Sequence, residues 1–213
     1  MMRYENIIFD LDGVLVSTDE YHYQAWQKIA DEEGIYFDRA INNRLRGVSR
    51  MESLDIILER AGKKYTQAEK EALAQRKNTY YQQLLGQLTS ADTLKGVRET
   101  LLDLRQKDVH IAVGSSSKNT MRILKQVGLE NAFDAIADGT EITKSKPDPE
   151  VFLLAAQKLG AKPETCLVVE DAAAGVNAGC NAGMPVAGIG EAAKSPRITY
   201  AIAEISDLLR IIA

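Results

Sequence analysis

The hydrophobic pattern of the chain alternates between short apolar runs and stretches with helical spacing. Apolar runs that do not alternate strictly with polar residues cover residues 7–9, 109–113, 135–137, 167–169 and 186–189. Such runs are typical of parallel strands that are buried on both faces of a sheet. Helix-spaced apolar residues lie between them, over residues 97–106, 120–127, 150–159 and 172–181. Single helices between successive strands predict a doubly wound, Rossmann-like α/β fold with a parallel sheet.

Residues 18–88 interrupt this alternation, because their patterns are helical only. Helices are predicted over residues 21–33, near 41–45, over 51–61 and over 67–85. In the third of these, the apolar residues fall on one face of the helix. A block of helices inserted after the first strand predicts a separate module, tethered by residues 14–17 and about 86–92. We therefore predict a core domain of residues 1–17 and 89–213 and an inserted, all-helical cap domain of residues 18–88.

The composition excludes several classes of partner. A formal net charge of −4 gives no basic field for binding nucleic acid or an anionic membrane, so any bound phosphate must be held by a local arrangement of groups. No apolar run approaches the ~20 residues that a membrane span needs, and the N-terminus MMRYENIIFD does not have the pattern of a signal peptide. Cys166 and Cys180 lack a second pair or a nearby histidine, which argues against zinc and disulfides and predicts two buried small side chains in a cytoplasmic protein.

The first predicted strand ends in two acidic residues one position apart, Asp10 and Asp12, followed by Gly13. Positions i and i+2 of an extended chain share a side, so the two carboxylates are expected to point together while Leu11 turns away. Ionising both is costly unless a cation or a proton relay occupies the spot. The alternative is that the pair only caps a loop.

Polar groups also follow three other predicted strands. Ser115, Ser116 and Ser117 precede a predicted helix, where hydroxyls and free N–H groups would form an anion cradle without net positive charge. Lys146 lies in the segment SKPDP, in which Asp148 is expected to cap the next helix and Pro149 to occupy its first position. Glu170 and Asp171 come directly after the strand at 167–169.

In parallel sheets these strand ends meet at one edge, so the polar groups are expected to form a single site. Several carboxylates in one pocket are the hard oxygen ligands that Mg²⁺ favours. Asp10 beside such a cation suits a phosphoryl-accepting nucleophile, because a carboxylate is already ionised and attacks without a base. Asp12 would then handle the proton, while Lys146 and the cation offset charge on the transferring oxygens.

The four motifs, in this order, resemble those of the haloacid dehalogenase superfamily. The motifs are DLDG after the first strand, a serine after the next, lysine in SKPDP, and ED after a later strand. In the inserted module, EYH with QAW, GVSR at residues 47–50 and RKN at 76–78 resemble the β-phosphoglucomutase family within it, as do FDAIAD and SKPDP further on. The likeness extends from the first strand to about residue 190.

The resemblance implies a magnesium-dependent phosphosugar mutase. It would interconvert β-D-glucose 1-phosphate and D-glucose 6-phosphate through an aspartyl phosphate and β-glucose 1,6-bisphosphate, with one Mg²⁺ in each monomer. The first linker reads Val-Ser-Thr where the family often has an aspartate in the middle, and position 46 is arginine where lysine is common. These departures concern the hinge and the sugar contacts rather than the phosphoryl transfer.

The resemblance also implies a role for each site residue. Asp10 would be the nucleophile and Asp12 the general acid/base, and the metal ligands would be Asp10, the backbone carbonyl of Asp12, Glu170 and Asp171. Ser115 and Lys146 would hold the transferring phosphate, with Ser116, Ser117 and Asn119 nearby. In the cap, Arg50 would bind the distal phosphate, Arg46, Gly47, Val48 and Ser49 would shape the sugar pocket, and Thr18, His22 and Lys77 would couple cap closure to Asp12.

Two alternative functions, a phosphatase and a sugar-phosphate sensor, would use all or some of the same residues. A phosphatase on this fold would admit water to the phosphoenzyme, and a sugar-phosphate sensor would bind without turnover, although a sensor needs neither a phosphoryl acceptor nor a proton shuttle.

Individual residues also have structural alternatives: a packed histidine for His22, a solvated residue for Arg50, and a cap and turn for Ser116 and Ser117. Arg76 and Lys77 point about 100° apart on a helix, so at most one of them is expected in the cleft.

Overall fold

A single parallel sheet of six strands, in the order β3-β2-β1-β4-β5-β6, lies within residues 4–212, the part of the chain that the computed structural model describes. The strands are β1 (Asn6–Phe9), β2 (His110–Gly114), β3 (Ala135–Ala137), β4 (Cys166–Glu170), β5 (Val186–Gly188) and β6 (Tyr200–Ala201). The predicted α/β fold with a parallel sheet is confirmed. The short strand β6 was not predicted, because its two residues form no apolar run.

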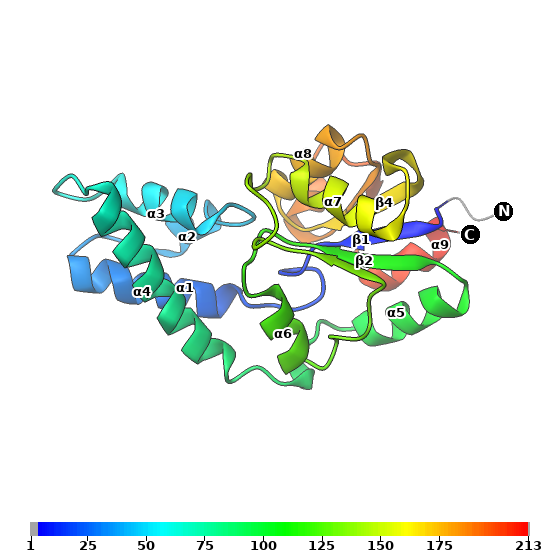
Figure 1. Cartoon of the computed structure of the whole chain (residues 1–213), viewed down its shortest axis with the longest axis horizontal. Helices are drawn as coiled ribbons and strands as arrows, with labels where there is room; N and C mark the ends of the chain where they lie inside the picture. Colours follow the sequence, from blue (N-terminus) through cyan, green and yellow to red (C-terminus); the bar gives the residue numbers. More distant parts are fainter. Residues whose placement is uncertain (1–3, 213) are drawn as a thin grey trace.

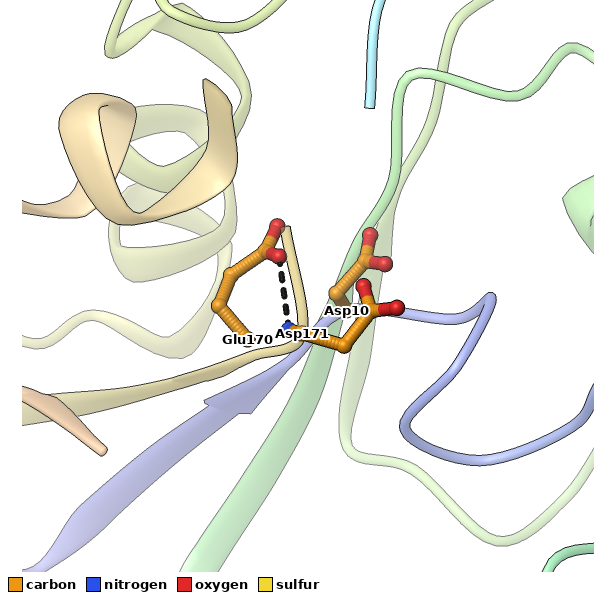
Figure 2. Close-up of side chains that lie close together, drawn as sticks. All are labelled: Asp10, Glu170 and Asp171. Carbon is orange, nitrogen blue, oxygen red and sulfur yellow. Dashed lines mark hydrogen bonds between the residues drawn. The ribbon is translucent and has the colours of Figure 1, made fainter. Parts of the chain in front are cut away.

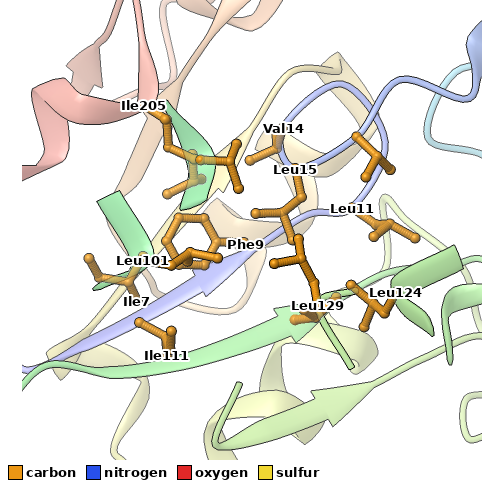
Figure 3. Packing of buried hydrophobic residues seen from close by; sticks show 14 of the residues in the cluster. Ile7, Phe9, Leu11, Val14, Leu15, Leu101, Ile111, Leu124, Leu129 and Ile205 are labelled. Carbon is orange, nitrogen blue, oxygen red and sulfur yellow. The ribbon is translucent and has the colours of Figure 1, made fainter. Parts of the chain in front are cut away.

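Helices cover both faces of the sheet (Figure 1). One face carries α5 (Val97–Gln106), α6 (Thr120–Gln126) and α9 (Leu208–Ile211), and the other carries α7 (Glu150–Leu159) and α8 (Ala173–Asn181). The residues of β1 divide between the two faces with the period of a strand. Ile7 and Phe9 pack with Leu101 and Leu124 (Figure 3), whereas Ile8 packs with Phe152 on the opposite face. Burial on both faces explains why residues 7–9 of β1 form a continuous apolar run.

The remaining α-helices form a layer beyond the carboxyl ends of the strands (Figure 1). They are α1 (Asp19–Glu33), α2 (Arg39–Asn43), α3 (Arg50–Leu58) and α4 (Gln67–Leu85). Capping boxes at Ser49 and Thr66 begin α3 and α4 and satisfy N–H groups that the first helical turn leaves free. A separate apolar cluster, which includes Trp26, Ile29 and Leu54, holds this layer together.

The chain crosses between the two layers at two neighbouring points. Val16 pairs with Thr93 in an isolated antiparallel bridge, and the Leu94 N–H donates to the Leu15 carbonyl at 2.9 Å. Val14 and Leu15 are buried in the sheet-side core, so the first tether is packed rather than free. Crossings that lie side by side support the proposed division into residues 18–88 and the rest. Residues 1–3 and 213 of the proposed core domain lie outside the described residues.

Short 3₁₀ helices complete the described chain, at η1 (Ser90–Asp92), η2 (Pro163–Thr165), η3 (Gly190–Lys194) and η4 (Ile205–Asp207). Within residues 4–212, no helix combines the length and the apolar character required to cross a bilayer. The two cysteines are unpaired there, and only Cys166 is fully buried. Cys180 is half-buried, with its thiol against the Arg197 carbonyl, so the prediction of two buried side chains was wrong for Cys180.

Candidate active site

The candidate site lies at the carboxyl ends of β1, β2 and β4, where the strand order changes direction. The chain runs from β1 through β2 to β3 on one side and then returns to place β4 on the other side of β1. Phe9 is in register with both Val113 and Val169, so the residues that follow β1, β2 and β4 stand at the same level. Ligands of open α/β sheets bind at such a switch point.

Three carboxylates meet at this point (Figure 2). Oxygen atoms of Asp10, Glu170 and Asp171 all lie within 4.8 Å of one another. Asp10 is 8% exposed and Glu170 is fully buried. The Glu170 carboxylate is fixed by the backbone N–H groups of Asp171 and Ala172, which donate to Oε2 at 2.9 and 3.0 Å. Its orientation is therefore set before any ligand binds.

Lys146 joins two of these carboxylates. Its Nζ donates to Asp10 Oδ1 and to Glu170 Oε1, both at 2.6 Å, and its side chain is 1% exposed. Burial alone would lower the pKa of Lys146, but the negative charges of Asp10 and Glu170 outweigh it and raise that pKa. The ammonium group therefore remains charged beside the nucleophile candidate. A surface position for Lys146 is excluded by its burial.

The electrostatics of the cluster suit a divalent cation. Burial raises the pKa of Glu170, and burial together with the charges of Glu170 and Asp10 raises the pKa of Asp171 to about 8. Lys146 and Arg46, which lies 3.7 Å from Asp171 Oδ2, supply two positive charges for three acidic groups, so the cluster favours a further proton or cation. Closely spaced, hard carboxylate oxygens are suitable ligands for a divalent ion of the magnesium or calcium type.

We expect the affinity for Mg²⁺ to rise with pH. A metal ion binds the ionised carboxylates, so binding must displace the proton that the raised pKa keeps on Asp171 below about pH 8. Each displaced proton should change the apparent affinity by about tenfold per pH unit below that pKa. Titration calorimetry in two buffers of different ionisation enthalpy measures the proton release. An affinity that stays constant from about pH 6 to pH 8 would contradict this linkage.

Two glycines allow the carboxylates to approach the backbone this closely. Gly13 has φ +79°, and a Cβ at that position would overlap the Asp171 carboxylate. A Cβ on Gly175, in α8, would overlap the Glu170 carboxylate. The group that Gly13 accommodates is thus a side chain of the protein itself. Both glycines thus belong to the architecture of the acidic cluster.

We expect Gly175→Ala to weaken metal binding by at least about tenfold, because Glu170 must leave the position that its backbone donors hold. The affinity is measured by calorimetry with Mg²⁺ at fixed pH. Gly62→Ala is the matched control, since a Cβ there meets no atom within 4 Å. Equal affinities for the two variants would show that the Glu170 position does not matter for metal binding.

Asp12 stands apart from the acidic cluster and contacts the helical layer. Its Oδ1 accepts hydrogen bonds from the Thr18 N–H at 3.1 Å and from the Thr18 hydroxyl, and its Oδ2 lies 3.9 Å from His22 Nε2. Burial raises the pKa of Asp12 to about 6, with the Thr18 hydrogen bond opposing the shift and the Asp10 charge adding to it. A carboxyl with this pKa exchanges a proton near neutral pH, as a general acid/base must.

His22 and Lys77 extend these contacts into the cap. Lys77 Nζ lies 2.8 Å from His22 Nδ1, and Lys77 is 2% exposed. Burial and the charges of Lys77 and Arg50 lower the pKa of His22 well below its usual value, so the imidazole is neutral. Arg76 turns the other way and pairs with Glu32 and Glu33, which agrees with the expectation that at most one of the two adjacent cations enters the cleft.

In the serine segment after β2, the side-chain oxygens of Ser115 and Ser117 accept hydrogen bonds from backbone N–H groups of the same segment. Ser115 Oγ accepts the Ser117 N–H at 3.2 Å, and Ser117 Oγ accepts the Asn119 N–H at 3.1 Å. Because Ser115 Oγ is already an acceptor, its hydrogen can point to a phosphate oxygen. The helix α6 begins only at Thr120, so the loop itself, and not a helix start directly after the serines, lines the site.

The helix α7 begins at Glu150, as its apolar spacing predicts, but Pro149 was expected at its first position and Asp148 as its cap. Pro149 is its N-cap and Glu150 its first residue, while Asp148 accepts the Glu150 N–H at 3.0 Å.

The cap contributes cations to the opposite wall. Arg50 Nη2 donates to Asn78 Oδ1 at 2.8 Å, and Asn119 Nδ2 donates to the same oxygen at 3.1 Å. Arg46 contacts Asp19 and lies 3.7 Å from Asp171 Oδ2, so a cap residue reaches the acidic cluster. Its buried Nε has no hydrogen-bond partner among the described residues.

One cavity of about 810 Å³ connects these groups. Its wall includes nearly all of the predicted site residues, namely Asp10, Asp12, His22, Arg46, Gly47, Val48, Ser49, Arg50, Lys77, Ser115, Ser116, Ser117, Asn119, Lys146 and Asp171. Thr18 and Glu170 lie behind the wall and act on residues that form it. Thr18 is fully buried against Asp12, a position that is compatible with the expected coupling of the cap to Asp12.

A family model described as haloacid dehalogenase-like hydrolase matches residues 4–183. The chain is also 44% identical over 204 residues to a β-phosphoglucomutase of Bacillus subtilis, an alignment that covers 95% of this chain and 90% of the relative. The chain belongs to the haloacid dehalogenase-like hydrolase family.

Two further proteins similar to this haloacid dehalogenase-like chain have different activities in their names. A crystal structure of β-phosphoglucomutase from Clostridium difficile superimposes with a TM-score of 0.91 at 40% identity, covering 96% of this chain and 93% of that one. A phosphorylated carbohydrates phosphatase of Thermotoga maritima is 31% identical over 183 residues, covering 84% of this chain and 82% of the relative. Because both activities occur among the relatives, the cleft must be considered before a function is assigned.

Two residues of this haloacid dehalogenase-like site were missed by the sequence analysis. Tyr81 contacts Thr18, His22 and Lys77, and Asn78 links Arg50 to Asn119. Tyr81 lies four positions after Lys77 on α4, so the spacing places both on one helical face. That spacing was the available signal, but it identifies no role without knowledge of what the face contacts.

Proposed function

We propose that the chain is a β-phosphoglucomutase, which interconverts β-D-glucose 1-phosphate and D-glucose 6-phosphate. The observation that carries the proposal is a single cavity with phosphate-binding candidates from both layers: Lys146 and Ser115 on the sheet side and Arg50 on the cap side. An enzyme that passes a bisphosphate through one site needs a second phosphate site opposite the reacting one. The 44% identity to the Bacillus subtilis β-phosphoglucomutase supports the same assignment.

In the proposed reaction, Asp10 carries the phosphoryl group. Its carboxylate attacks phosphorus, the bond between phosphorus and the sugar oxygen breaks, and an aspartyl phosphate forms. Lys146 Nζ, which is 2.6 Å from Asp10 Oδ1, stabilises the charge on the transferring oxygens, and the Ser115 hydroxyl donates its hydrogen to one of them. Asp10, Glu170, Asp171 and the backbone carbonyl of Asp12 would hold Mg²⁺, which offsets further negative charge on that group.

Asp12 would move the proton in each half-reaction. When the 6-hydroxyl of β-glucose 1-phosphate attacks phospho-Asp10, Asp12 accepts the hydroxyl proton and β-glucose 1,6-bisphosphate forms. After the bisphosphate has turned around, Asp10 attacks the 1-phosphate and Asp12 returns the proton to the 1-oxygen. Arg50 would bind the phosphate that is not reacting, and a bidentate guanidinium suits either end of the bisphosphate.

The cap residues distinguish this proposal from hydrolysis. Thr18, the N-cap of α1, and His22, in its first turn, hold the Asp12 carboxylate from the cap side. The acid/base is therefore aligned by the layer that closes over a sugar and excludes water. A phosphatase would instead leave Asp12 available to activate water at the phosphoenzyme.

The test supplies β-glucose 1-phosphate, Mg²⁺ and a trace of β-glucose 1,6-bisphosphate. We expect glucose 6-phosphate to accumulate, detected through coupled oxidation by glucose-6-phosphate dehydrogenase. Stoichiometric release of inorganic phosphate would replace the proposal with a phosphatase, and binding without turnover would indicate a sensor. A panel of α- and β-hexose 1-phosphates in the same assay identifies the sugar and the anomer.

A further inference from the structure

A buried tyrosine on the cap connects to Asp12 through a single intervening hydroxyl. Tyr81, on α4, is 1% exposed, and its hydroxyl lies 2.8 Å from Thr18 Oγ1. The Thr18 hydroxyl in turn donates to Asp12 Oδ1, which also accepts the Thr18 N–H at 3.1 Å. Tyr81, Thr18 and Asp12 therefore form a continuous chain of hydrogen bonds from the second long cap helix to the acid/base of the core.

The direction of this chain follows from the number of protons. The Thr18 hydroxyl has a single hydrogen, and an ionised Asp12 carboxylate can only accept, so that hydrogen goes to Asp12. Tyr81 must then be the donor to Thr18 Oγ1. The phenol is in the donor form, because burial and the nearby Asp12 charge raise the pKa of Tyr81 well above its usual value. A hydrogen bond received by Thr18 strengthens the one that it donates.

The ring of Tyr81 contacts the other residues around Asp12. It packs on the His22 imidazole with a centroid separation of 4.0 Å, and Lys77 Nζ lies 4.4 Å from its centroid. Tyr81 and Thr18 belong to opposite ends of the inserted module, since Thr18 follows the first tether and Tyr81 precedes the second. One side chain thus joins both sides of the hinge to the residues that hold the acid/base.

We propose that Tyr81 is a positioning residue for Asp12: its hydroxyl holds the Thr18 hydroxyl in the orientation that aims the Asp12 carboxylate at the reacting sugar oxygen. This inference rests on the proposed function, because it assigns Tyr81 a part in the proton transfer of the mutase. Without the phenol, the Thr18 hydroxyl is free to rotate toward another acceptor, and Asp12 Oδ1 keeps only the backbone donor. Misalignment of this kind costs catalysis rather than binding.

The test compares Tyr81→Phe with Tyr80→Phe in the mutase assay. Tyr80 is the matched control, since its hydroxyl also donates at 2.8 Å, to Glu32, on the exposed side of the same helix. We expect Tyr81→Phe to lower kcat by about 10- to 100-fold with little change in KM, and Tyr80→Phe to leave both unchanged. A kcat for Tyr81→Phe equal to that of Tyr80→Phe would overturn the inference.

A double-mutant cycle with Thr18→Val tests whether Tyr81 acts through Thr18. If it does, Tyr81→Phe should lower kcat further by less than about twofold in the Thr18→Val background. Full additivity of the two effects would overturn the inference, and urea unfolding of each variant checks that stability is retained. The wild-type protein is assayed in parallel. If the wild type forms no glucose 6-phosphate, the proposed function is wrong. If the wild type turns over normally and Tyr81→Phe has the same kcat, only the role of Tyr81 is wrong.

Discussion

Replacing Asp10 by asparagine is expected to abolish turnover, with kcat reduced by about 10⁴-fold or more. The amide has nearly the same shape as the carboxylate but cannot form the acyl phosphate on which both half-reactions depend. It also leaves Lys146 Nζ, at 2.6 Å from Asp10 Oδ1, with one charged partner in place of two. The loss of turnover is measured by the formation of glucose 6-phosphate.

Mass spectrometry of the intact, acid-quenched protein provides an independent measurement for this substitution. The wild type should gain one phosphoryl group from the bisphosphate, and Asp10→Asn should gain none. Asp31→Asn, which makes the same chemical change at an exposed position of α1, should behave as the wild type in both assays. Full activity in Asp10→Asn would show that another group is the phosphoryl acceptor.

The carboxyl-end cluster could be predicted because it follows from topology. Asp10 follows β1 and Glu170 ends β4, and parallel strands bring their carboxyl ends to one edge. Apolar runs and helical spacing identified these strands with ends shifted by at most about one residue. The correct order of strands and helices was therefore enough to predict that Asp10 and Glu170 lie close together.

The contacts between the two layers could not be predicted in this way. Tyr81 and Thr18 are 63 positions apart, and their hydrogen bond depends on how α4 packs against the start of α1. Helical periodicity places Tyr81 on one face, but the partner of that face is a tertiary property. Similarly, the fit of the Glu170 carboxylate against Gly175 depends on side-chain packing that local sequence patterns do not encode.

The environment of Lys146 could be predicted only in part. The SKPDP segment indicated a lysine near the phosphate, and the structure places it between Asp10 and Glu170 with a side chain that is 1% exposed. A buried ammonium group that pairs with two buried carboxylates links catalysis to folding. Its removal should therefore affect both activity and stability, unlike the removal of an ordinary catalytic side chain.

We expect Lys146→Met to lower the free energy of unfolding at neutral pH by about 3–5 kcal/mol, because it leaves buried carboxylates without their partner. Methionine keeps an apolar side chain against Phe152, whose ring centroid lies 4.6 Å from Nζ, so lost packing is a minor part of the effect. Urea unfolding without added metal measures the change. Lys158→Met is the matched control: its ion pair with Glu141 is one-third exposed, and its loss should cost less than about 1 kcal/mol.

The dependence on pH separates this mechanism from a packing defect. Burial already raises the pKa of Glu170, and removing Lys146 should raise that pKa further. A carboxyl whose pKa is higher in the folded state than in the unfolded state takes up protons on folding, so acidification favours the folded protein. Lys146→Met should therefore regain stability relative to wild type as the pH falls from about 8 to about 5. A destabilisation independent of pH, and equally large in Lys146→Met/Glu170→Gln, would show that the paired charges are not its origin.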